Sequence, residues 1–191
     1  VVDFAYDASM IKALTRSVPP GEYAADIAVA FERCAALRVT FGPDAPVAWH
    51  PATAPDGGHV AGVDAGNLAV IDIGAYAAAT VREESAYEDL VVDTESLAEL
   101  IRFGAGEPCG VVASSGWGDG AYPSWWGVDA AGQAVQLVVD FCLLVHAVTR
   151  EVVAWADGGF DLGVPGVRIT TEPGRFSFWR GQIPGRLVLS A

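Results

Sequence analysis

The sequence predicts a mainly β protein, an antiparallel β-sandwich or open barrel built of hairpins with a few short helices. Apolar and polar residues alternate with a period of two over 22–41 and again over 133–141, which is typical of strands with one buried face. Further short strands recur along the chain, mostly separated by Gly/Pro turns, as in domains whose successive strands pair antiparallel. With 191 residues, of which 52% are hydrophobic, the chain has enough material for a sizeable core.

The first elements are a short helix and a hairpin. A helix is expected over 9–17, before Pro19-Pro20-Gly21 stops it. Residues 22–31 then alternate, Glu32-Arg33 is interpreted as a turn, and 35–41 alternate again. This pattern predicts an antiparallel pair whose apolar side chains share one face.

The middle of the chain is expected to mix short strands with two helices. Strands are predicted over 47–49 and 68–73, a loop over 51–59, and a glycine-flanked turn over 62–66. Helical spacing of apolar residues predicts a helix over 75–81 and a better one over 94–102, capped by Asp93-Thr94.

The second half is expected to be a β-meander followed by shorter strands. The meander would consist of strands over 109–113, 122–128 and 133–141. Shorter strands are expected near 152–155, 167–170, 175–179 and 187–189. We expect residues 1–191 to be one domain, with a core over 18–141 and a strand-rich extension over 142–191 packed on it.

The charge balance restricts the partners. The chain has 24 acidic against 11 basic residues and a net charge of −13. Nucleic-acid affinity rests on Lys and Arg neutralising phosphates, so we expect no nucleic-acid partner, and anionic membranes are disfavoured for the same reason. A basic protein, a cationic ligand or a metal ion remains compatible.

Other features concern compartment and membrane. The longest uncharged apolar stretch, 141–149, is too short to span a bilayer. The N-terminus lacks the basic and apolar regions of a signal peptide. The three cysteines are an odd number without CxxC spacing, which predicts small buried core residues rather than disulfides or a zinc ribbon. We therefore expect a cytoplasmic protein.

Four segments carry a resemblance to a known family. They are Val18–Tyr23, Gly62–Gly66 with Asp72, Ser115–Gly120 with Tyr122-Pro123, and Val138–Phe141. Over about residues 18–141 the chain resembles the bacterial family of unknown function DUF4241, and the Gly-Trp-Gly-Asp-Gly element is the most specific part. The resemblance implies no activity, but it implies that the two Asp/Gly segments belong to a shared architecture.

The glycine-rich segment Ser114–Pro123 is the main candidate binding loop. Three glycines in five positions let the backbone approach a partner closely, and Trp117 and Tyr122 flank Asp119. The functional interpretation is a ligand-contacting loop at the sheet rim that includes Ser115 and is anchored by Asp119. The structural interpretation is a hairpin loop whose carboxylate caps backbone N–H groups. No Lys follows the glycines, which argues against a phosphate cradle.

Two adjacent tryptophans extend this candidate site. The side chains of Trp125 and Trp126 point to opposite faces of a strand. One is therefore expected in the core and the other exposed or at an interface, unless both are covered. Trp126 is included among the candidate binding residues.

Three carboxylates form a second candidate constellation. Asp64 lies in a glycine-flanked turn, Asp72 ends the following strand and Asp119 lies in the binding loop. Together they would suit Mg²⁺ or Ca²⁺, which prefer oxygen ligands, and a close pair would suit general acid/base work. The alternative is that each carboxylate caps a turn. No HxH, HExxH or nucleophile-elbow motif is present.

These observations leave three functional hypotheses. The first is a non-catalytic binding protein of the immunity or inhibitor type, which engages a basic protein partner and needs no cofactor. The second is a metal-assisted hydrolase or other small-molecule enzyme that uses Asp64, Asp72 and Asp119 with Mg²⁺ or Ca²⁺. The third is a structural domain without a site.

Overall fold

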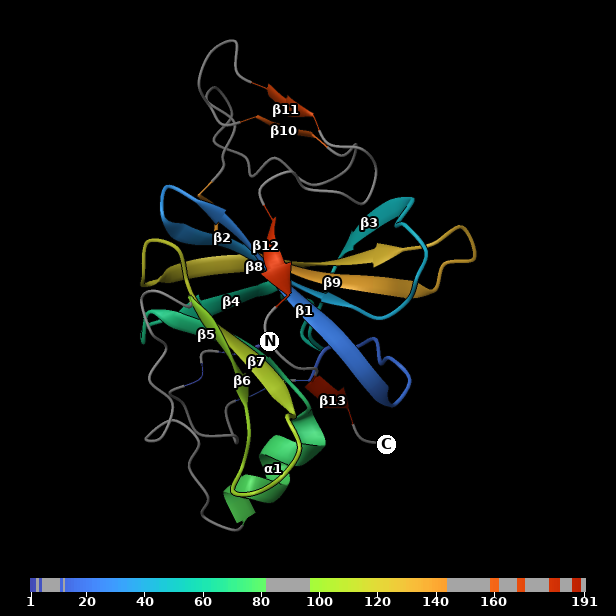
Figure 1. Ribbon diagram of the computed structural model, residues 1–191. Coiled ribbons are helices and arrows are strands. Elements are labelled where there is room, and N and C mark those ends of the chain that lie inside the picture. Colours follow the sequence, from blue (N-terminus) through green and yellow to red (C-terminus); the bar gives the residue numbers. More distant parts are fainter. Residues whose placement is uncertain are drawn as a thin grey trace.

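The computed structural model describes residues 1–2, 4, 11, 13–81 and 97–143, together with the backbone of four short strands between 159 and 189. These residues form open antiparallel sheets built largely of hairpins, with a single helix in the described part (Figure 1). The predicted fold class is therefore confirmed. In the same residues, no helix has the length and apolar character needed to cross a membrane.

The larger sheet contains eight strands. Its main path runs β12-β1-β2-β9-β8-β3, while β13 also pairs with β1 and β4 with β8. The strands are β1 (Gly21–Ala30), β2 (Arg33–Thr40), β3 (Ala48–Pro51), β4 (Val60–Val63), β8 (Gly120–Val128), β9 (Ala134–Asp140), β12 (Trp179–Gln182) and β13 (Leu187–Leu189). The β1–β2 and β8–β9 hairpins confirm the two alternating stretches seen in the sequence.

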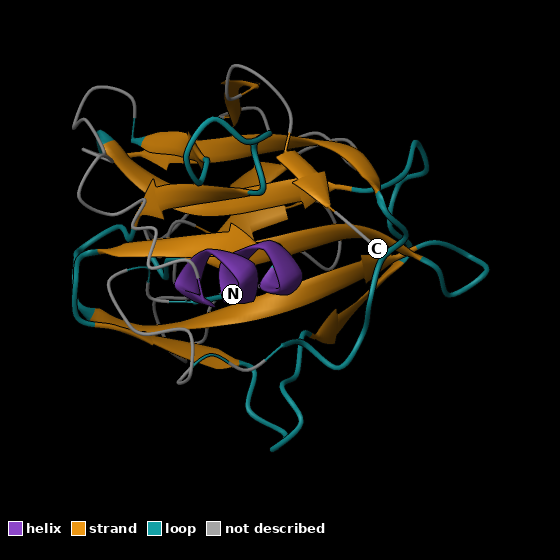
Figure 2. Ribbon diagram, turned by 90° about the horizontal axis from the view of Figure 1, so that it is seen from below, coloured by secondary structure: helices purple, strands orange, loops and turns teal. Residues whose placement is uncertain are grey.

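The smaller sheet has three strands in the order β5-β7-β6. These are β5 (Asn67–Ile71), β6 (Ala98–Ile101) and β7 (Gly110–Ser114); β10 (Gly159–Asp161) and β11 (Arg168–Thr170) pair separately. Helix α1 (Ile73–Val81) is seen in front of the strands in Figure 2, and its Tyr76 and Ala79 join Phe103 and Val112 in a small core. The expected helix over 75–81 is thus confirmed.

The main core lies between the two sheets, as in a sandwich. Leu37 and Val39 of β2 and Leu137 of β9 face it from the larger sheet. Leu68 of β5 and Val111 of β7 face it from the smaller sheet. All five side chains are almost completely buried.

The predicted helix over 9–17 is wrong in the part of that range that the structure describes. Residues 11 and 13–17 are not helical. The backbone N–H of Thr15 instead donates to the carbonyl oxygen of Thr53 at 2.9 Å. This segment therefore satisfies its backbone by pairing with the loop before β4, and residues 9, 10 and 12 lie outside the described part.

The predicted helix over 94–102 is also wrong, because residues 98–101 form strand β6. Ala98 and Leu100 pack in the main core, whereas Ile101 belongs to the small core. An alternation between two cores produces apolar spacings that a short helix would also show. Residues 93–96 lie outside the described part.

The predicted three-stranded meander is wrong as well. Strand β7 pairs with β5 and β6, and the loop after it carries the chain into the larger sheet at β8. The β1–β2 turn is also displaced by one residue, since Phe31 and Glu32 have the positive φ values of 53° and 60°. Part of the expected turn over 62–66 belongs to strand β4.

In the C-terminal part, β11 and β13 confirm strands that were predicted near 167–170 and 187–189. Strands β12 and β13 both pair with β1. The predicted strand over 152–155 and residues 175–178 lie outside the described part. The division into one domain with an extension stays a prediction.

Candidate functional site

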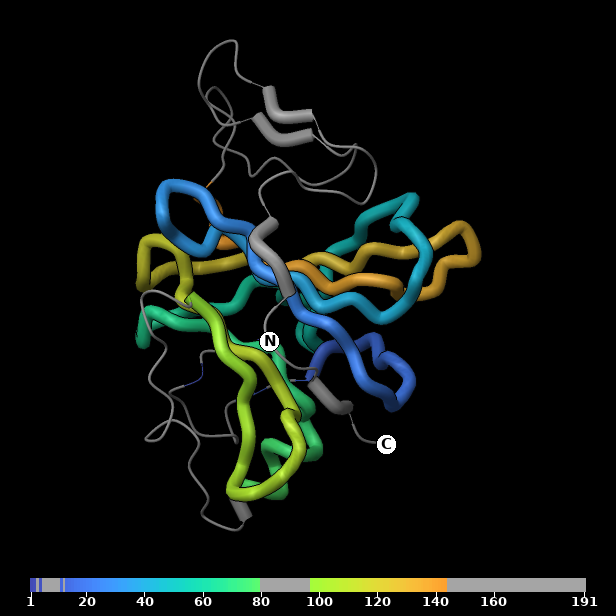
Figure 3. The backbone as a smooth tube through the Cα atoms, in the orientation of Figure 1, coloured from blue at the N-terminus to red at the C-terminus, as the bar shows by residue number. Residues whose placement is uncertain are grey.

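Three turns meet at one end of the sheets, on the left in Figures 1 and 3. They are residues 31–33, which comprise the β1–β2 turn and the first residue of β2, residues 64–66 between β4 and β5, and residues 115–119 between β7 and β8. The Ser115 N–H donates to the Gly66 carbonyl at 3.1 Å, and Arg33 Nη1 donates to the Gly116 carbonyl at 3.1 Å. We call these three segments the three-turn edge.

The loop over 115–119 is held by its own polar groups. Ser115 is buried, and its Oγ donates to the Gly118 carbonyl at 2.7 Å. The Tyr122 hydroxyl donates to the carbonyls of both Ser115 and Gly118, at 2.8 Å each. Burial raises the pKa of this tyrosine. Ser115 and Tyr122 therefore shape the loop from inside rather than offer groups to a ligand.

Glycine is required at position 116 of this loop. Gly116 has a φ of 61°, and a Cβ there would overlap the side chain of Leu143. The close approach fixes the loop against the core, so that the next residue, Trp117, points outward.

Trp117 is the most exposed large aromatic side chain among the described residues, at 64%. The guanidinium carbon of Arg33 lies 4.5 Å from the centre of its ring, a cation–π contact. Because Arg33 is also hydrogen-bonded to Gly116, the cation holds the ring against the loop. The indole is thus exposed and positioned at once.

Phe31 and Arg33 were missed by the sequence analysis. The alternating pattern placed Phe31 on the buried face, but it lies at the tip of the β1–β2 hairpin and is 63% exposed. The available signal was the hairpin itself, because a residue at the tip has no strand partner and cannot reach a core. Phe31 and Trp117 are therefore two exposed aromatic rings at one edge.

The three turns that carry these rings also carry acidic residues. Glu32, Asp64 and Asp119 are exposed, and the pairing of Val63 with Gly120 brings the segments that carry Asp64 and Asp119 together. Within the described residues of the three-turn edge, three carboxylates thus accompany the guanidinium of Arg33, so this set of residues carries a net negative charge.

Asp72 lies elsewhere. Roughly 20 Å of extended chain separates it from Gly66, at about 3.3 Å per residue along β5. Its Oδ1 accepts the Ala75 N–H at 2.8 Å, which is the contact of a helix N-cap. Within the described residues no group of three His, Cys, Asp or Glu side chains could hold a metal ion. The structure therefore does not bring Asp64, Asp72 and Asp119 together as a metal centre.

Trp126 is also away from the edge. It is 5% exposed, its ring centre lies 5.9 Å from that of Phe41, and it borders a cavity of about 230 Å³ that Asp72 also lines. Trp125 is half-buried on the other face, where its ring lies 5.6 Å from that of His59. One of the two tryptophans is thus in the core, as expected, but the exposed one is Trp117.

Comparisons with curated proteins and with solved structures give no match. The family model described as "Protein of unknown function (DUF4241)" matches residues 3–139. That range contains every segment of the three-turn edge and most of both sheets. The chain therefore belongs to the DUF4241 family.

Proposed function

We propose that this protein is a non-catalytic binding protein, of the immunity or inhibitor type, whose three-turn edge docks a basic protein partner. The observation that carries the proposal is Trp117, which is 64% exposed yet held in place by Arg33. A large aromatic ring is ordinarily buried within its own fold, so a ring that stays exposed is available to a partner. Tryptophan is also enriched among the residues that dominate binding energy.

Preorganisation adds to this argument. Ordering a mobile interface side chain costs about 0.5–1.5 kcal/mol on association. For Trp117, the contacts of Arg33 with its ring and with Gly116 meet part of that cost before a partner arrives. The buried hydroxyls of Ser115 and Tyr122 do the same for the backbone of the loop.

The β1–β2 turn supports the proposal through its backbone. Phe31 and Glu32 both have positive φ, where Asn-Gly or Asp-Gly is preferred. Each residue with a Cβ costs roughly 1–2 kcal/mol in this region, and such strain clusters at functional sites. Here the strained turn points Phe31 into solvent beside an acidic residue.

Charge selects the class of partner. The net charge of −13 attracts a basic protein over long range and raises its association rate. Glu32, Asp64 and Asp119 place negative charge on the three-turn edge, where a partner's Lys and Arg side chains would meet them at the rim.

The metal-assisted hydrolase has no specific observation in its favour. Asp72 caps α1, and no metal-binding group of three side chains occurs among the described residues.

The test begins with identification of a partner. The immobilised protein is exposed to a lysate of its source cells, and retained basic proteins are identified, purified and titrated by calorimetry. Trp117→Ala should weaken binding by about 2 kcal/mol, roughly thirtyfold. Asp119→Asn should mainly slow association at low salt.

Two control variants change residues that follow the C-terminal end of β2, away from the three-turn edge. Val47 is an exposed apolar residue, at 66%, and Asp44 is an exposed acid. Val47→Ala and Asp44→Asn should leave the affinity unchanged. Retention of no basic protein, or equal losses in the edge and control variants, would contradict the proposal.

A further inference from the structure

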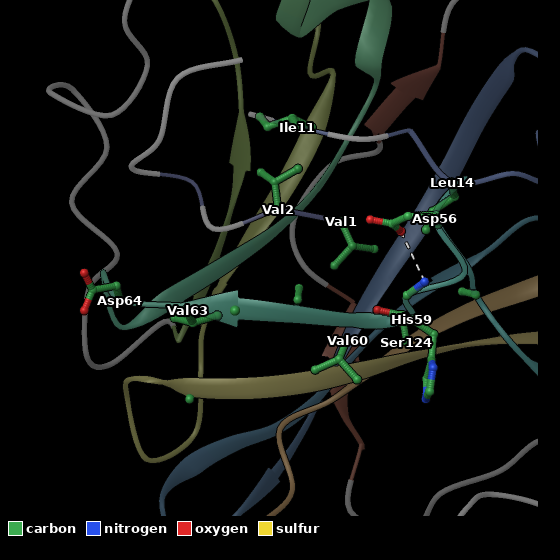
Figure 4. Close-up of a pocket in the computed structure, with 16 residues that line it drawn as sticks. Val1, Val2, Ile11, Leu14, Asp56, His59, Val60, Val63, Asp64 and Ser124 are labelled. Carbon is green, nitrogen blue, oxygen red and sulfur yellow. Dashed lines mark hydrogen bonds between the residues drawn. The ribbon is translucent and has the colours of Figure 1, made fainter. Parts of the chain in front are cut away.

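A cavity of about 680 Å³ lies beside strand β4 (Figure 4). The pairing of β8 explains why the space exists. Residues 120–123 of β8 pair with β4, and residues 125–128 pair with β3. Residues 52–59, which connect β3 to β4, therefore leave the sheet as a loop. Ser124 lies at the gap, where its N–H donates to the His59 carbonyl and its carbonyl accepts the Ala52 N–H.

The walls of the cavity are mainly apolar. Val2, Ile11 and Leu14 line it from the N-terminal segment, and Val60 and Val63 line it from β4. The volume lies within the roughly 300–1,000 Å³ typical of small-molecule sites, which are also mostly apolar. A ligand would therefore bury a hydrocarbon or aromatic body here.

The polar groups at the cavity are few: none of the described lining residues is a Lys or Arg, and the one amine is the α-amino group of Val1. Asp56 and Ser124 lie at one end of β4 and Asp64 at the other (Figure 4). Ser124 is 2% exposed. The imidazole of His59 points away from Val1 and Val2 in this view and packs near the ring of Trp125.

We infer that this cavity binds a small apolar molecule that carries a protonated amine, with the amine at the end formed by Asp56 and Ser124. The Asp56 carboxylate supplies the opposite charge, and the Ser124 hydroxyl supplies an acceptor inside the wall. A carboxylate-bearing ligand would meet acids at both ends of the cavity, and the α-amino group of Val1, which also lines it, is mostly uncharged at neutral pH because burial lowers its pKa to about 6. This inference is independent of the partner proposed for the three-turn edge.

The probes are three molecules with one hydrocarbon chain and different head groups: octylamine, octanol and octanoate. Each is titrated into ¹⁵N-labelled protein while amide resonances are followed. Octylamine should cause saturable shifts at Ala52–Gly58, Val60–Val63 and Ser124. A hydrogen bond between charged groups favours the amine by about tenfold or more over the carboxylate.

Two variants separate charge from volume. Asp56→Asn keeps the Oδ1 acceptor that the Gly58 N–H uses at 3.2 Å but removes the charge, so the preference for octylamine over octanol should disappear. Ala61→Leu adds volume at a lining residue and should weaken all three probes. Asp44→Asn makes the same charge change at an exposed acid outside the cavity and should alter nothing.

Three results would overturn the inference. They are octylamine shifts that lie away from the cavity, equal affinities for octylamine and octanoate, and an amine preference that survives in a folded Asp56→Asn variant. Loss of a partner protein in Trp117→Ala has no bearing on these measurements, so failure of the two proposals is distinguishable.

Discussion

Replacing Tyr122 with phenylalanine removes one hydroxyl from the support of the loop that presents Trp117. That hydroxyl donates to the carbonyl oxygens of Ser115 and Gly118, at 2.8 Å in both cases. The ring itself keeps its edge-on contact with Phe141, with 5.3 Å between centroids. The variant therefore leaves the core filled and tests the hydrogen bonds alone.

The expected loss follows from counting donors. A single proton serves both carbonyls, and each carbonyl keeps another donor. The Gly118 N–H donates to the Ser115 carbonyl at 3.0 Å, and Ser115 Oγ donates to the Gly118 carbonyl at 2.7 Å. No buried acceptor is orphaned, so Tyr122→Phe should lower the free energy of unfolding by about 1–1.5 kcal/mol, the net value of one hydrogen bond.

Urea unfolding followed by circular dichroism measures this loss, with an unchanged m-value showing that the folded and unfolded states are otherwise alike. Tyr23→Phe is the matched control. Its hydroxyl donates to the Pro19 carbonyl at 2.6 Å in an exposed position, so its loss should be smaller, at most about 0.5 kcal/mol. A loss above about 3 kcal/mol for Tyr122→Phe would mean that orphaned carbonyls were created, and equal losses for the two variants would refute the buried network.

The hairpins could be predicted because their pattern is local. In β2, Leu37 and Val39 face the main core with one polar or small residue between them. In β9, Leu137 and Val139 also belong to the main core, although Val138 between them is apolar and buried as well. Each strand's partner is the next segment of the chain, so the alternation and one turn determine the pairing.

Pairings between distant segments could not be predicted in this way. Strand β7 lies next to β5 and β6 rather than β8, yet all four carry apolar runs that fit either neighbour. Strand β6 alternates between two cores within four residues, too few to separate a period of two from 3.6. The choice depends on the second core, which no local pattern reveals.

In the candidate site, too, the local features could be predicted from the sequence and the contacts between distant segments could not. The loop over 115–119 was found because three glycines around Trp117 and Asp119 are a local signal. Its neighbours in the three-turn edge are contributed by the β1–β2 and β4–β5 turns, and only the structure shows that Arg33 reaches Gly116. The sequence likewise could not show that Asp72 caps a helix whereas Asp64 and Asp119 are exposed at the three-turn edge, because all three are aspartates next to turns.

Three further measurements test the packing and the titrating groups. A Cβ on Gly127 would lie 3.0 Å from the ring of Trp49, so Gly127→Ala should destabilise the protein by about 1–3 kcal/mol, the usual cost of overpacking, in thermal or urea unfolding. Asp72→Ala should cost about 1 kcal/mol through loss of the cap to the Ala75 N–H, whereas Asp72→Asn should retain most of it. The cysteines provide the third test, because burial, followed by the charge of Asp140, raises the pKa of Cys142 to about 12. Since the thiolate is the reactive form, Ellman's reagent at pH 8 should label this thiol only after urea unfolding. A folded pKa above the unfolded value of about 8.5 also means that the folded state holds the proton more tightly. Its contribution to stability is therefore complete below about pH 8.5 and declines as the pH rises from there towards 12. Cys142→Ala should flatten this alkaline decline, and rapid labelling of the folded protein at pH 8 would refute the argument.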